Sequence, residues 1–252
     1  MAVSSRDFIH MLPKIYVVIP AYKAALTVKS VFDRLPPAMA QKNVTYLVIN
    51  DGSTDDTEQI VRQIVATRSD ARLINHERNR GYAQAQKTGF KIALDEGADI
   101  VALLHADGQY APELLPQLLQ PLEAGEADLV QGSRMMRRQD ALKGGMPIHR
   151  WLGNVFLTGL ENLIYGLKMG EYHSGYMLYS RQLLTVVPYQ KMSDTFHFDG
   201  EMLFVAAKKG MRIKEIPIPT HYGDEKSHLN PITYGFTVLG IMFKYLTGKY
   251  DF

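Results

Sequence analysis

The sequence contains no cysteine among its 252 residues. Disulfide bonds, zinc–thiolate sites and thiol catalysis are therefore excluded, and a reducing compartment is compatible with the composition. An excess of charge is also missing, because 28 lysine and arginine residues face 26 aspartate and glutamate residues and leave a net charge of +2. Nucleic-acid binding normally needs a strongly basic surface. We therefore expect no nucleic-acid partner.

Long apolar runs are missing too. The longest one near the C-terminus, "FTVLGIMF" (236–243), is far shorter than the ~20 residues of a membrane-spanning helix, although it could lie on a membrane surface. The first 22 residues hold only the short run "IYVVIP" and no small-residue cleavage site, so they do not resemble a signal peptide. The sequence therefore predicts a cytoplasmic protein. A further possibility is peripheral contact with the inner face of the plasma membrane.

Internal repeats and low-complexity linkers are absent as well, which favours a single domain over 1–252. β-rich runs at 15–19, 44–50, 71–76 and 99–104 are each followed by a segment with helical periodicity. This alternation predicts an α/β fold with a mainly parallel sheet and helices on both faces.

The alternation breaks after residue 134. The segment "MMRRQDALKGGMPIHR" (135–150) is basic, contains glycine and has no clear period. It predicts a mobile loop at the rim of a cleft. Trp151 directly after it is expected to pack in the core.

Polar clusters follow the four predicted strands: "PAYK" (20–23), "NDGS" (50–53), "NRG" (79–81) and "HADGQ" (105–109). Ligands of open α/β sheets bind at the carboxyl ends of the strands. We therefore expect four separate loops to form one cleft.

The second cluster is the strongest local signal. Asp51 and Ser53 at a strand-to-helix turn can accept hydrogen bonds from a nucleobase or ribose, and a helix N-terminus favours a nearby anion. The alternative is a well-capped helix, with Ser53 or Thr54 as its N-cap.

The third cluster has the same two interpretations. Asn79, Arg80 and Lys87 beside a helix N-terminus suit a diphosphate. The alternative is a structural turn, which Gly81 permits.

Asp107 belongs to an Asp-Gly turn, which is common in proteins without a functional role there. Its place at a strand end also suits a divalent cation that bridges two phosphates, because Mg²⁺ and Mn²⁺ prefer oxygen ligands. Gln109 can add a second oxygen, and His105 can be a Mn²⁺ ligand or a neutral donor to a phosphate. We therefore predict Mg²⁺ or Mn²⁺ as the cofactor.

Seven segments together resemble the motifs of family 2 glycosyltransferases with a GT-A fold, in the same order and at similar spacings. They are "VVIPAYKAALTV", "VINDGSTDDT", "NRGYAQAQKTG", "HADGQYAPELL", "LVQGSR", "HSGYMLYSR" and "HFDGEMLFVAAKKGMRIKEIPI". The resemblance covers about 14–222. Within the family, the chain resembles the branch that contains dolichyl-phosphate mannose synthase and bacterial polyprenyl-phosphate glycosyltransferases. This resemblance implies a Rossmann-like fold in which 14–134 bind the nucleotide and 135–252 bind the acceptor.

The resemblance also implies roles for single residues. In it Asp51 matches an acid that holds the base or ribose, Asp107 matches the second acid of an Asp-Ala-Asp-Gly-Gln motif that helps hold a metal and the diphosphate, and Gln109 matches the glutamine of that motif. The expected nucleotide-sugar site comprises Pro20, Ala21, Tyr22, Asp51, Ser53, Asn79, Gly81, Lys87, His105, Ala106 and Asp107.

The acceptor side is expected to comprise Arg134, Ser174, Gly175, Lys226 and His228, of which Ser174 and Gly175 match the Ser-Gly of the family near its acceptor. Lys226 and His228 lie in a polar stretch that could fold over the diphosphate, which also makes His228 a candidate metal ligand. The alternative for this stretch is a solvated loop.

The resemblance implies inversion at the anomeric carbon, with Asp107 as a catalytic residue. A phosphate acceptor would need no base. A hydroxyl acceptor would need one, and Asp199 and Glu201 are the candidates, Glu201 matching an acid of the family. The alternative is a pair of acids that complements the helix macrodipole.

Several positions depart from the family pattern. Lys23 and Ala24 stand where Asn-Glu is common, so a usual ribose contact is missing. His105 replaces the first acid of the metal motif, which puts strict metal dependence in question. Glu171 occupies a position where the family often has an aspartate. The segment 220–231 lacks the Arg and Ser-Lys pattern of the dolichyl branch, so the acceptor of that branch cannot be assigned to this protein.

The sequence therefore predicts a glycosyltransferase with a UDP- or GDP-sugar as donor and a polyprenyl phosphate as acceptor. Two alternatives are transfer to a saccharide or other hydroxyl, and a sugar-nucleotide-binding protein that has lost turnover, with His105 and Ala24 as traces of that loss. The basic segment 137–150 and the amphipathic C-terminus fit a phospholipid surface. A homo-oligomer is a further expectation.

Overall fold

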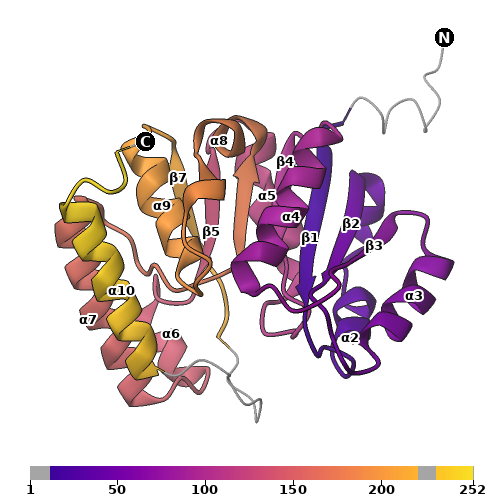
Figure 1. The fold of residues 1–252 in the computed structure, drawn as a ribbon, viewed down its shortest axis with the longest axis horizontal. Helices are drawn as coiled ribbons and strands as arrows, with labels where there is room; N and C mark the ends of the chain where they lie inside the picture. Colours follow the sequence, from indigo (N-terminus) through magenta and orange to yellow (C-terminus); the bar gives the residue numbers. More distant parts are fainter. Residues whose placement is uncertain (1–11, 221–230, 252) are drawn as a thin grey trace.

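The computed structural model describes residues 12–220 and 231–251. Its centre is a seven-stranded sheet in the order β3-β2-β1-β4-β6-β5-β7 (Figure 1). The strands are β1 (Lys14–Ala21), β2 (Asn43–Asn50), β3 (Ala71–Asn75), β4 (Ile100–Leu103), β5 (Leu129–Ser133), β6 (Met177–Ser180) and β7 (Ile213–Pro217).

Most neighbouring strands are parallel, as the alternation of strands and helices predicts. β1 pairs in parallel with both β2 and β4, and β2 pairs in parallel with β3. Only β6 runs against its neighbours β4 and β5 in the described sheet. The carboxyl ends of β1 to β4 therefore meet at one edge, where the four polar clusters follow them.

Helices cover both faces of the sheet. They are α2 (Val28–Asp33), α3 (Thr57–Thr67), α4 (Tyr82–Asp95), α5 (Leu115–Glu123), α6 (Arg138–Lys143), α7 (Ile148–Tyr165), α8 (Arg181–Val186), α9 (Phe198–Lys208) and α10 (Pro231–Leu246), with single turns of 3-10 helix at Pro37–Gln41, Pro112–Leu114 and Tyr189–Lys191. Side chains alternate along a strand. Tyr16 and Val18 of β1 therefore pack with α4 and α9, while Val17 and Ile19 pack on the opposite face with α2, α3 and α5.

The expectation of a mobile loop at 135–150 is wrong. This segment contains α6 and the first turn of α7, and Met135, Ala141 and Met146 are buried in a small cluster of their own. Because the spacing of these three residues fits neither the helical nor the strand period, periodicity does not reveal them. Trp151 packs against this small cluster and not in the main core, and its indole N–H donates to the carbonyl oxygen of Arg138 at 3.0 Å.

The expected N-cap at Ser53 or Thr54 is also wrong, because α3 begins at Thr57 with Asp56 before it. Ser53 has another use. Its hydroxyl oxygen accepts a hydrogen bond from the backbone N–H of Lys23 at 3.1 Å. The loop after β2 is thus tied to the loop after β1.

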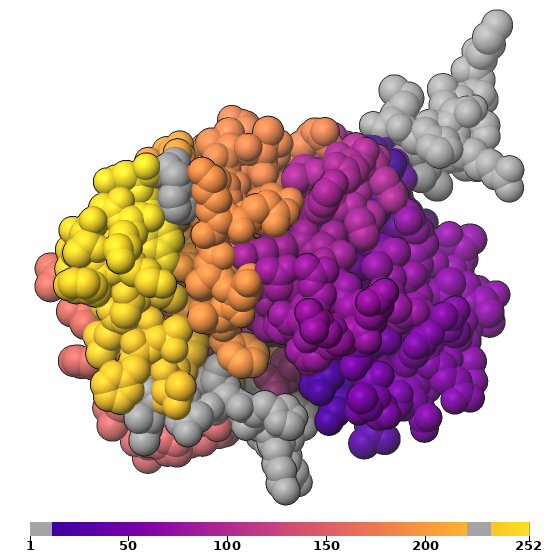
Figure 2. Space-filling model, in the orientation of Figure 1, coloured from indigo at the N-terminus to yellow at the C-terminus, as the bar shows by residue number. Residues whose placement is uncertain are grey.

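Helices α7 and α10 pack against each other at one end of the molecule (Figure 1). Figure 2 shows α10, in yellow, forming much of the surface at that end. Within the described part of the chain, no helix is both long and apolar enough to cross a bilayer.

Helix α4 lies so close to β1 that its Gly89 has no room for a methyl group. A Cβ atom there would lie 2.3 Å from a γ-methyl carbon of Val18, which is fully buried. We expect Gly89→Ala to destabilise the fold by about 1–3 kcal/mol, since overpacking forces a well-packed core apart. The denaturant midpoint measures this.

Gly153→Ala is the matched control, because nothing lies within 4 Å of a Cβ at this exposed position of α7. Replacing a helical glycine by alanine there should stabilise by about 0.5–1 kcal/mol. Equal midpoints for the two variants would contradict the close contact between α4 and β1.

Candidate active site

The end of β1 brings two of the expected site loops together. The carbonyl oxygen of Pro20 accepts from the N–H of Ala106 at 3.4 Å, and that of the next residue, Ala21, accepts from the N–H of Asp51 at 2.8 Å. The turn with Asp107 and the loop with Asp51 therefore lie on either side of β1.

The loops after β2 and β3 also meet closely. Gly52 has a positive φ of 64°, and a Cβ atom there would lie 2.3 Å from the carbonyl carbon of Arg78. Only glycine allows this approach. The polar clusters that the sequence places after four strands thus converge on one edge of the sheet.

Asp51 is buried, and both of its carboxylate oxygens have protein partners. One oxygen lies 2.6 Å from Nδ1 of His76 and accepts from the N–H of Arg80 at 2.9 Å, while the other accepts from the N–H of Gly81 at 2.8 Å. This carboxylate fixes the loop that leads into α4. A contact with a base or ribose stays a prediction.

Lys87 is almost fully buried, and its ammonium group is engaged by the chain itself. It donates to the carbonyl oxygen of Met192 at 2.7 Å and to the carboxylate of Asp194 at 2.8 Å. It thereby ties α4 to the segment before α9. Asn79, by contrast, is exposed at the same edge.

Asp107 is exposed, at the tip of the turn after β4. One of its carboxylate oxygens accepts from the backbone N–H of Gln109 at 3.0 Å, and Gly108 between them has a φ of 75°. The side chain of Gln109 is exposed beside it. A carboxylate and an amide oxygen are ligands that suit Mg²⁺ or Mn²⁺, so these residues fit the expected cation.

His105 lies inward of this turn. Its Nε2 is 3.0 Å from the hydroxyl oxygen of Tyr82, and its ring packs edge-on against Tyr110. A Cβ atom at residue 175 would lie 2.7 Å from Cε1 of His105, so the glycine there is required. Burial lowers the pKa of His105, although the nearby charge of Asp107 opposes this shift. The imidazole is therefore neutral at pH 7.

Asp199 is connected to His105 through Tyr82. The Tyr82 hydroxyl donates to the Asp199 carboxylate at 2.7 Å. Burial raises the pKa of Asp199 to about 6, against the opposing effect of this hydrogen bond. The three side chains form a continuous polar line from the turn after β4 to the start of α9.

Glu201, two residues further along α9, has different surroundings. Its carboxylate accepts from the backbone N–H of Ser193 at 2.9 Å, from the Ser193 hydroxyl at 2.7 Å, and from the hydroxyl of Tyr250. It is completely buried. These contacts join α9 to its flanking segments, and a catalytic role for Glu201 stays a prediction.

The segment 171–175 is held by the end of β5. Arg134 donates to the Glu171 carboxylate at 2.8 Å and to the carbonyl oxygen of His173 at 2.6 Å. Burial raises the pKa of Glu171, but the guanidinium of Arg134 outweighs this and leaves the pKa below its usual value. The hydroxyl of Ser174 donates to the carbonyl of Gly132. This ion pair and the Ser174 hydrogen bond fix the backbone ahead of β6.

Gly175 faces the centre of the site, and its N–H donates to the hydroxyl of Tyr110 at 2.8 Å. Of the first cluster, Pro20 is partly buried, Ala21 is buried, and Tyr22 presents an exposed ring. Lys226 and His228, including the metal-ligand prediction for His228, lie outside the described residues.

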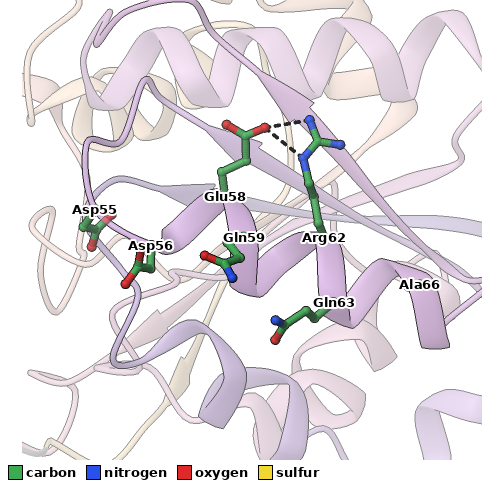
Figure 3. A pocket seen from close by; sticks show the side chains of 7 residues that line it. All are labelled: Asp55, Asp56, Glu58, Gln59, Arg62, Gln63 and Ala66. Carbon is green, nitrogen blue, oxygen red and sulfur yellow. Dashed lines mark hydrogen bonds and ion pairs between the residues drawn. The ribbon is translucent and has the colours of Figure 1, made fainter.

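A hollow on the outer side of α3 lies elsewhere (Figure 3). Asp55, Asp56, Glu58 and Arg62 are among its lining residues, and Glu58 pairs with Arg62 at 2.6 Å. Helix α3 and the two residues before it supply the whole lining. Ligand sites normally collect groups from several elements, so we assign no function to this hollow.

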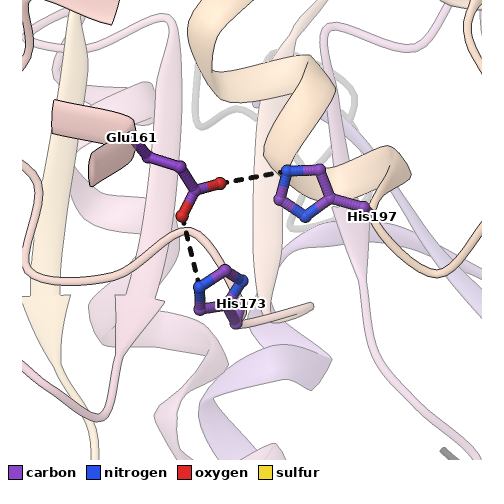
Figure 4. A group of neighbouring side chains, drawn as sticks. All are labelled: Glu161, His173 and His197. Atoms are coloured by element: carbon purple, nitrogen blue, oxygen red, sulfur yellow. Dashed lines mark ion pairs between the residues drawn. The ribbon is translucent and has the colours of Figure 1, made fainter. Parts of the chain in front are cut away.

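Sequence motifs do not reveal every polar group near the site. Tyr82 and Tyr110 directly follow the third and fourth clusters and could have been found there. Glu161, His173 and His197 could not, because they are far apart in the sequence and meet only in the fold (Figure 4).

Comparison with known proteins agrees with this architecture. The family described as "Glycosyl transferase family 2" matches residues 16–187. A UDP-N-acetylglucosamine–dolichyl-phosphate N-acetylglucosaminyltransferase of Methanococcus voltae is 30% identical over 223 residues, which are 82% of this chain and 86% of that protein. An undecaprenyl-phosphate mannosyltransferase of Micrococcus luteus is 28% identical over 210 residues, covering 81% and 82%.

Solved structures show the same fold. Glucosyl-3-phosphoglycerate synthase of Mycobacterium tuberculosis, in complex with Mn²⁺, UDP-glucose and phosphoglyceric acid, superposes with a TM-score of 0.65 at 20% identity. The match covers 97% of this chain and 84% of that protein. The resemblance inferred from the seven motifs is thus confirmed: the chain belongs to glycosyl transferase family 2 and is a nucleotide-sugar-binding glycosyltransferase with a GT-A fold.

Proposed function

We propose that the protein transfers a sugar, with inversion, from a nucleoside-diphosphate sugar to a polyprenyl phosphate at a membrane surface. The observation that carries the donor half is the exposed carboxylate of Asp107 at the edge where the loops after β1 to β4 meet. The M. voltae relative is named for a UDP-sugar, which favours UDP over GDP.

Asp107 and Gln109 would hold a divalent cation at this edge, and such an ion neutralises the charge that grows on the departing diphosphate. The exposed ring of Tyr22 at the end of β1 is placed to stack on the base. Neutral His105 adds no negative charge near the diphosphate.

The acceptor half follows from an apolar surface on α7 and α10, two helices whose buried sides contact the segment 171–175. Helix α7 leaves four large apolar side chains exposed, and α10 leaves four more: Ile148, Leu152, Phe156, Leu163, Phe236, Leu239, Phe243 and Leu246. At 3.6 residues per turn, each set of four side chains lies within about a quarter of the circumference of its helix. An apolar stripe on an otherwise folded surface marks a partner or a membrane.

A polyprenyl phosphate has its chain in the bilayer and its phosphate at the interface. Such an acceptor explains the apolar surface, and it needs no catalytic base, since a phosphate oxygen is already a nucleophile. The relatives of M. voltae and M. luteus are named for lipid-phosphate acceptors, which supports the same assignment.

A hydroxyl acceptor is the second candidate function. It is favoured by Asp199, whose raised pKa makes it a stronger base than an ordinary aspartate and whose carboxylate reaches the site through Tyr82. A purified protein that moves sugar to a soluble saccharide and not to a lipid phosphate would select this function. Saturable donor binding without any turnover would select the third interpretation, a binding protein.

The donor site is tested with Asp107→Asn. The exchange keeps the size of the side chain but removes its charge, so we expect turnover to fall by about 100-fold or more, as for the loss of other transition-state contacts. UDP with Mn²⁺ should raise the thermal unfolding midpoint of the wild type, because a ligand that binds the native state stabilises it. The same additions should raise the midpoint of the variant much less.

Asp33→Asn is the control, since Asp33 is an exposed carboxylate on α2 that pairs only with Lys29 in the contacts described. It should behave as the wild type in both assays. Undiminished stabilisation of Asp107→Asn by UDP and Mn²⁺ would remove this residue from the donor site.

The acceptor surface is tested with Phe156→Glu and Phe243→Glu. Burial of one phenylalanine side chain contributes about 1.5–3 kcal/mol, so each exchange should weaken binding to phosphatidylcholine–phosphatidylglycerol vesicles by about tenfold or more. Transfer to a long-chain polyprenyl phosphate in those vesicles should fall in parallel. Transfer to a short, water-soluble prenyl phosphate should not change.

Val186→Glu, at an exposed apolar position of α8, controls for the added charge. It should leave vesicle binding intact. The membrane assignment fails if all three variants bind vesicles as the wild type does, or if transfer to the soluble acceptor is lost as well.

A further inference from the structure

A second polar centre lies behind the acceptor side (Figure 4). Glu161 comes from the middle of α7, His173 from the segment before β6, and His197 from the residue before α9. One carboxylate oxygen of Glu161 lies 3.2 Å from Nε2 of His173, and the other lies 3.1 Å from Nε2 of His197. Glu161 and His197 are fully buried, and the His173 side chain is only 9% exposed.

Both distances lie within hydrogen-bond range, but neither contact is a hydrogen bond. Both carboxylate oxygens of Glu161 and both Nε2 atoms are buried without a hydrogen-bond partner. A buried carboxylate left in this state is costly unless a positive charge compensates it. One ligand atom from each residue lies within 4.8 Å of the other two, so the three are close enough together to bind a single ion.

The outer sides of the two imidazoles meet a single group. Nδ1 of His173 lies 2.9 Å and Nδ1 of His197 lies 3.0 Å from the hydroxyl oxygen of Tyr234. A tyrosine hydroxyl has one proton but can accept two hydrogen bonds. Both contacts are satisfied at once if both Nδ1 atoms carry protons, which leaves two Nε2 lone pairs directed at Glu161.

We propose that Glu161, His173 and His197 bind one divalent transition-metal ion, for which Zn²⁺ is the best fit. Two imidazoles and one carboxylate with a fourth position for water are a common zinc ligand set, whereas Mg²⁺ prefers oxygen ligands only. Ligand atoms about 2.0–2.1 Å from a tetrahedral zinc ion lie about 3.3 Å apart. The two separations between an Nε2 atom and a Glu161 oxygen are close to this value, and the three ligand atoms together lie within 4.8 Å of one another. The hydrogen bonds to Tyr234 are the outer support that metal-bound histidines usually have.

This ion would be distinct from the one at Asp107 in both place and chemistry. The ligands at Asp107 and Gln109 are exposed oxygens, while those of the second centre are mainly buried nitrogens. The proposal therefore does not depend on the proposed function.

The location gives the ion a positioning role. His173 directly precedes Ser174 and Gly175, and His197 lies two residues before Asp199. Gly200 leaves room for the imidazole of His197, because a Cβ atom at this position would lie 2.3 Å from its Cε1. One ion would thus hold α7, the segment 171–175 and the start of α9 in a fixed relation.

The test uses the full chain without an affinity tag. Metal is removed with a chelator, and Zn²⁺ or Co²⁺ is added in the presence of excess Mg²⁺. We expect one Zn²⁺ per chain by elemental analysis, and with Co²⁺ the intense visible absorption of a four-coordinate ion. His197→Ala and Glu161→Gln should lose both signals, and Tyr234→Phe should bind about 10–100-fold more weakly, as other losses of outer support do.

His149→Ala is the matched control, because His149 is an exposed histidine on the same helix as Glu161. It should retain one Zn²⁺ and the Co²⁺ spectrum. Circular dichroism checks that each variant is folded, and the Co²⁺ titration of the wild type decides the question even where a variant is not.

A wild type that shows no four-coordinate Co²⁺ spectrum overturns the proposal, and so does zinc that folded His197→Ala and Glu161→Gln retain. Sugar transfer by a protein without zinc affinity would refute only this inference. Zinc binding without sugar transfer would refute only the proposed function.

Discussion

The two hydrogen bonds at the end of β1 are the constraint on which the candidate site depends. The carbonyl oxygens of Pro20 and Ala21 are consecutive, so they point to opposite sides of the strand and bind the turns after β4 and β2. Because β1 lies inside the sheet between β2 and β4 and most of its residues are buried, neither turn can move without breaking its hydrogen bond to this strand. A nucleotide laid across the end of β1 would therefore meet both turns in a fixed geometry.

Four carboxylates lie near this edge, and their different surroundings determine which of them can bind a cation. Both oxygens of Asp51 accept hydrogen bonds from the loop before α4, and the charge of Glu171 is paired with that of Arg134. Asp199 is buried with a raised pKa, while Asp107 alone of these four is exposed. A cation has access only to the last, so exposure and not motif strength makes Asp107 the strongest candidate for a metal ligand.

The sequence predicts the sheet and the convergence of the loops well, because strand alternation and turn residues are local signals. It does not predict α6, because the buried residues in this helix and on either side of it pack against α7 and follow no local period. Lys87 illustrates a second limit. Its position suits a phosphate, yet in the fold its ammonium group reaches Met192 and Asp194, more than 100 residues later in the chain. The Glu161 centre is equally non-local, and only tertiary structure assembles it.

The exchange of an acid for His105 follows from the same tertiary contacts. Tyr82, Tyr110 and Gly175 enclose this side chain, and a carboxylate enclosed in this way would be costly to ionise. A neutral imidazole avoids that cost and can donate a hydrogen bond. With one carboxylate fewer, the chain alone would bind a cation weakly, and the diphosphate of the donor would have to supply the remaining oxygen ligands. Cation and nucleotide would then bind cooperatively, each completing the site of the other.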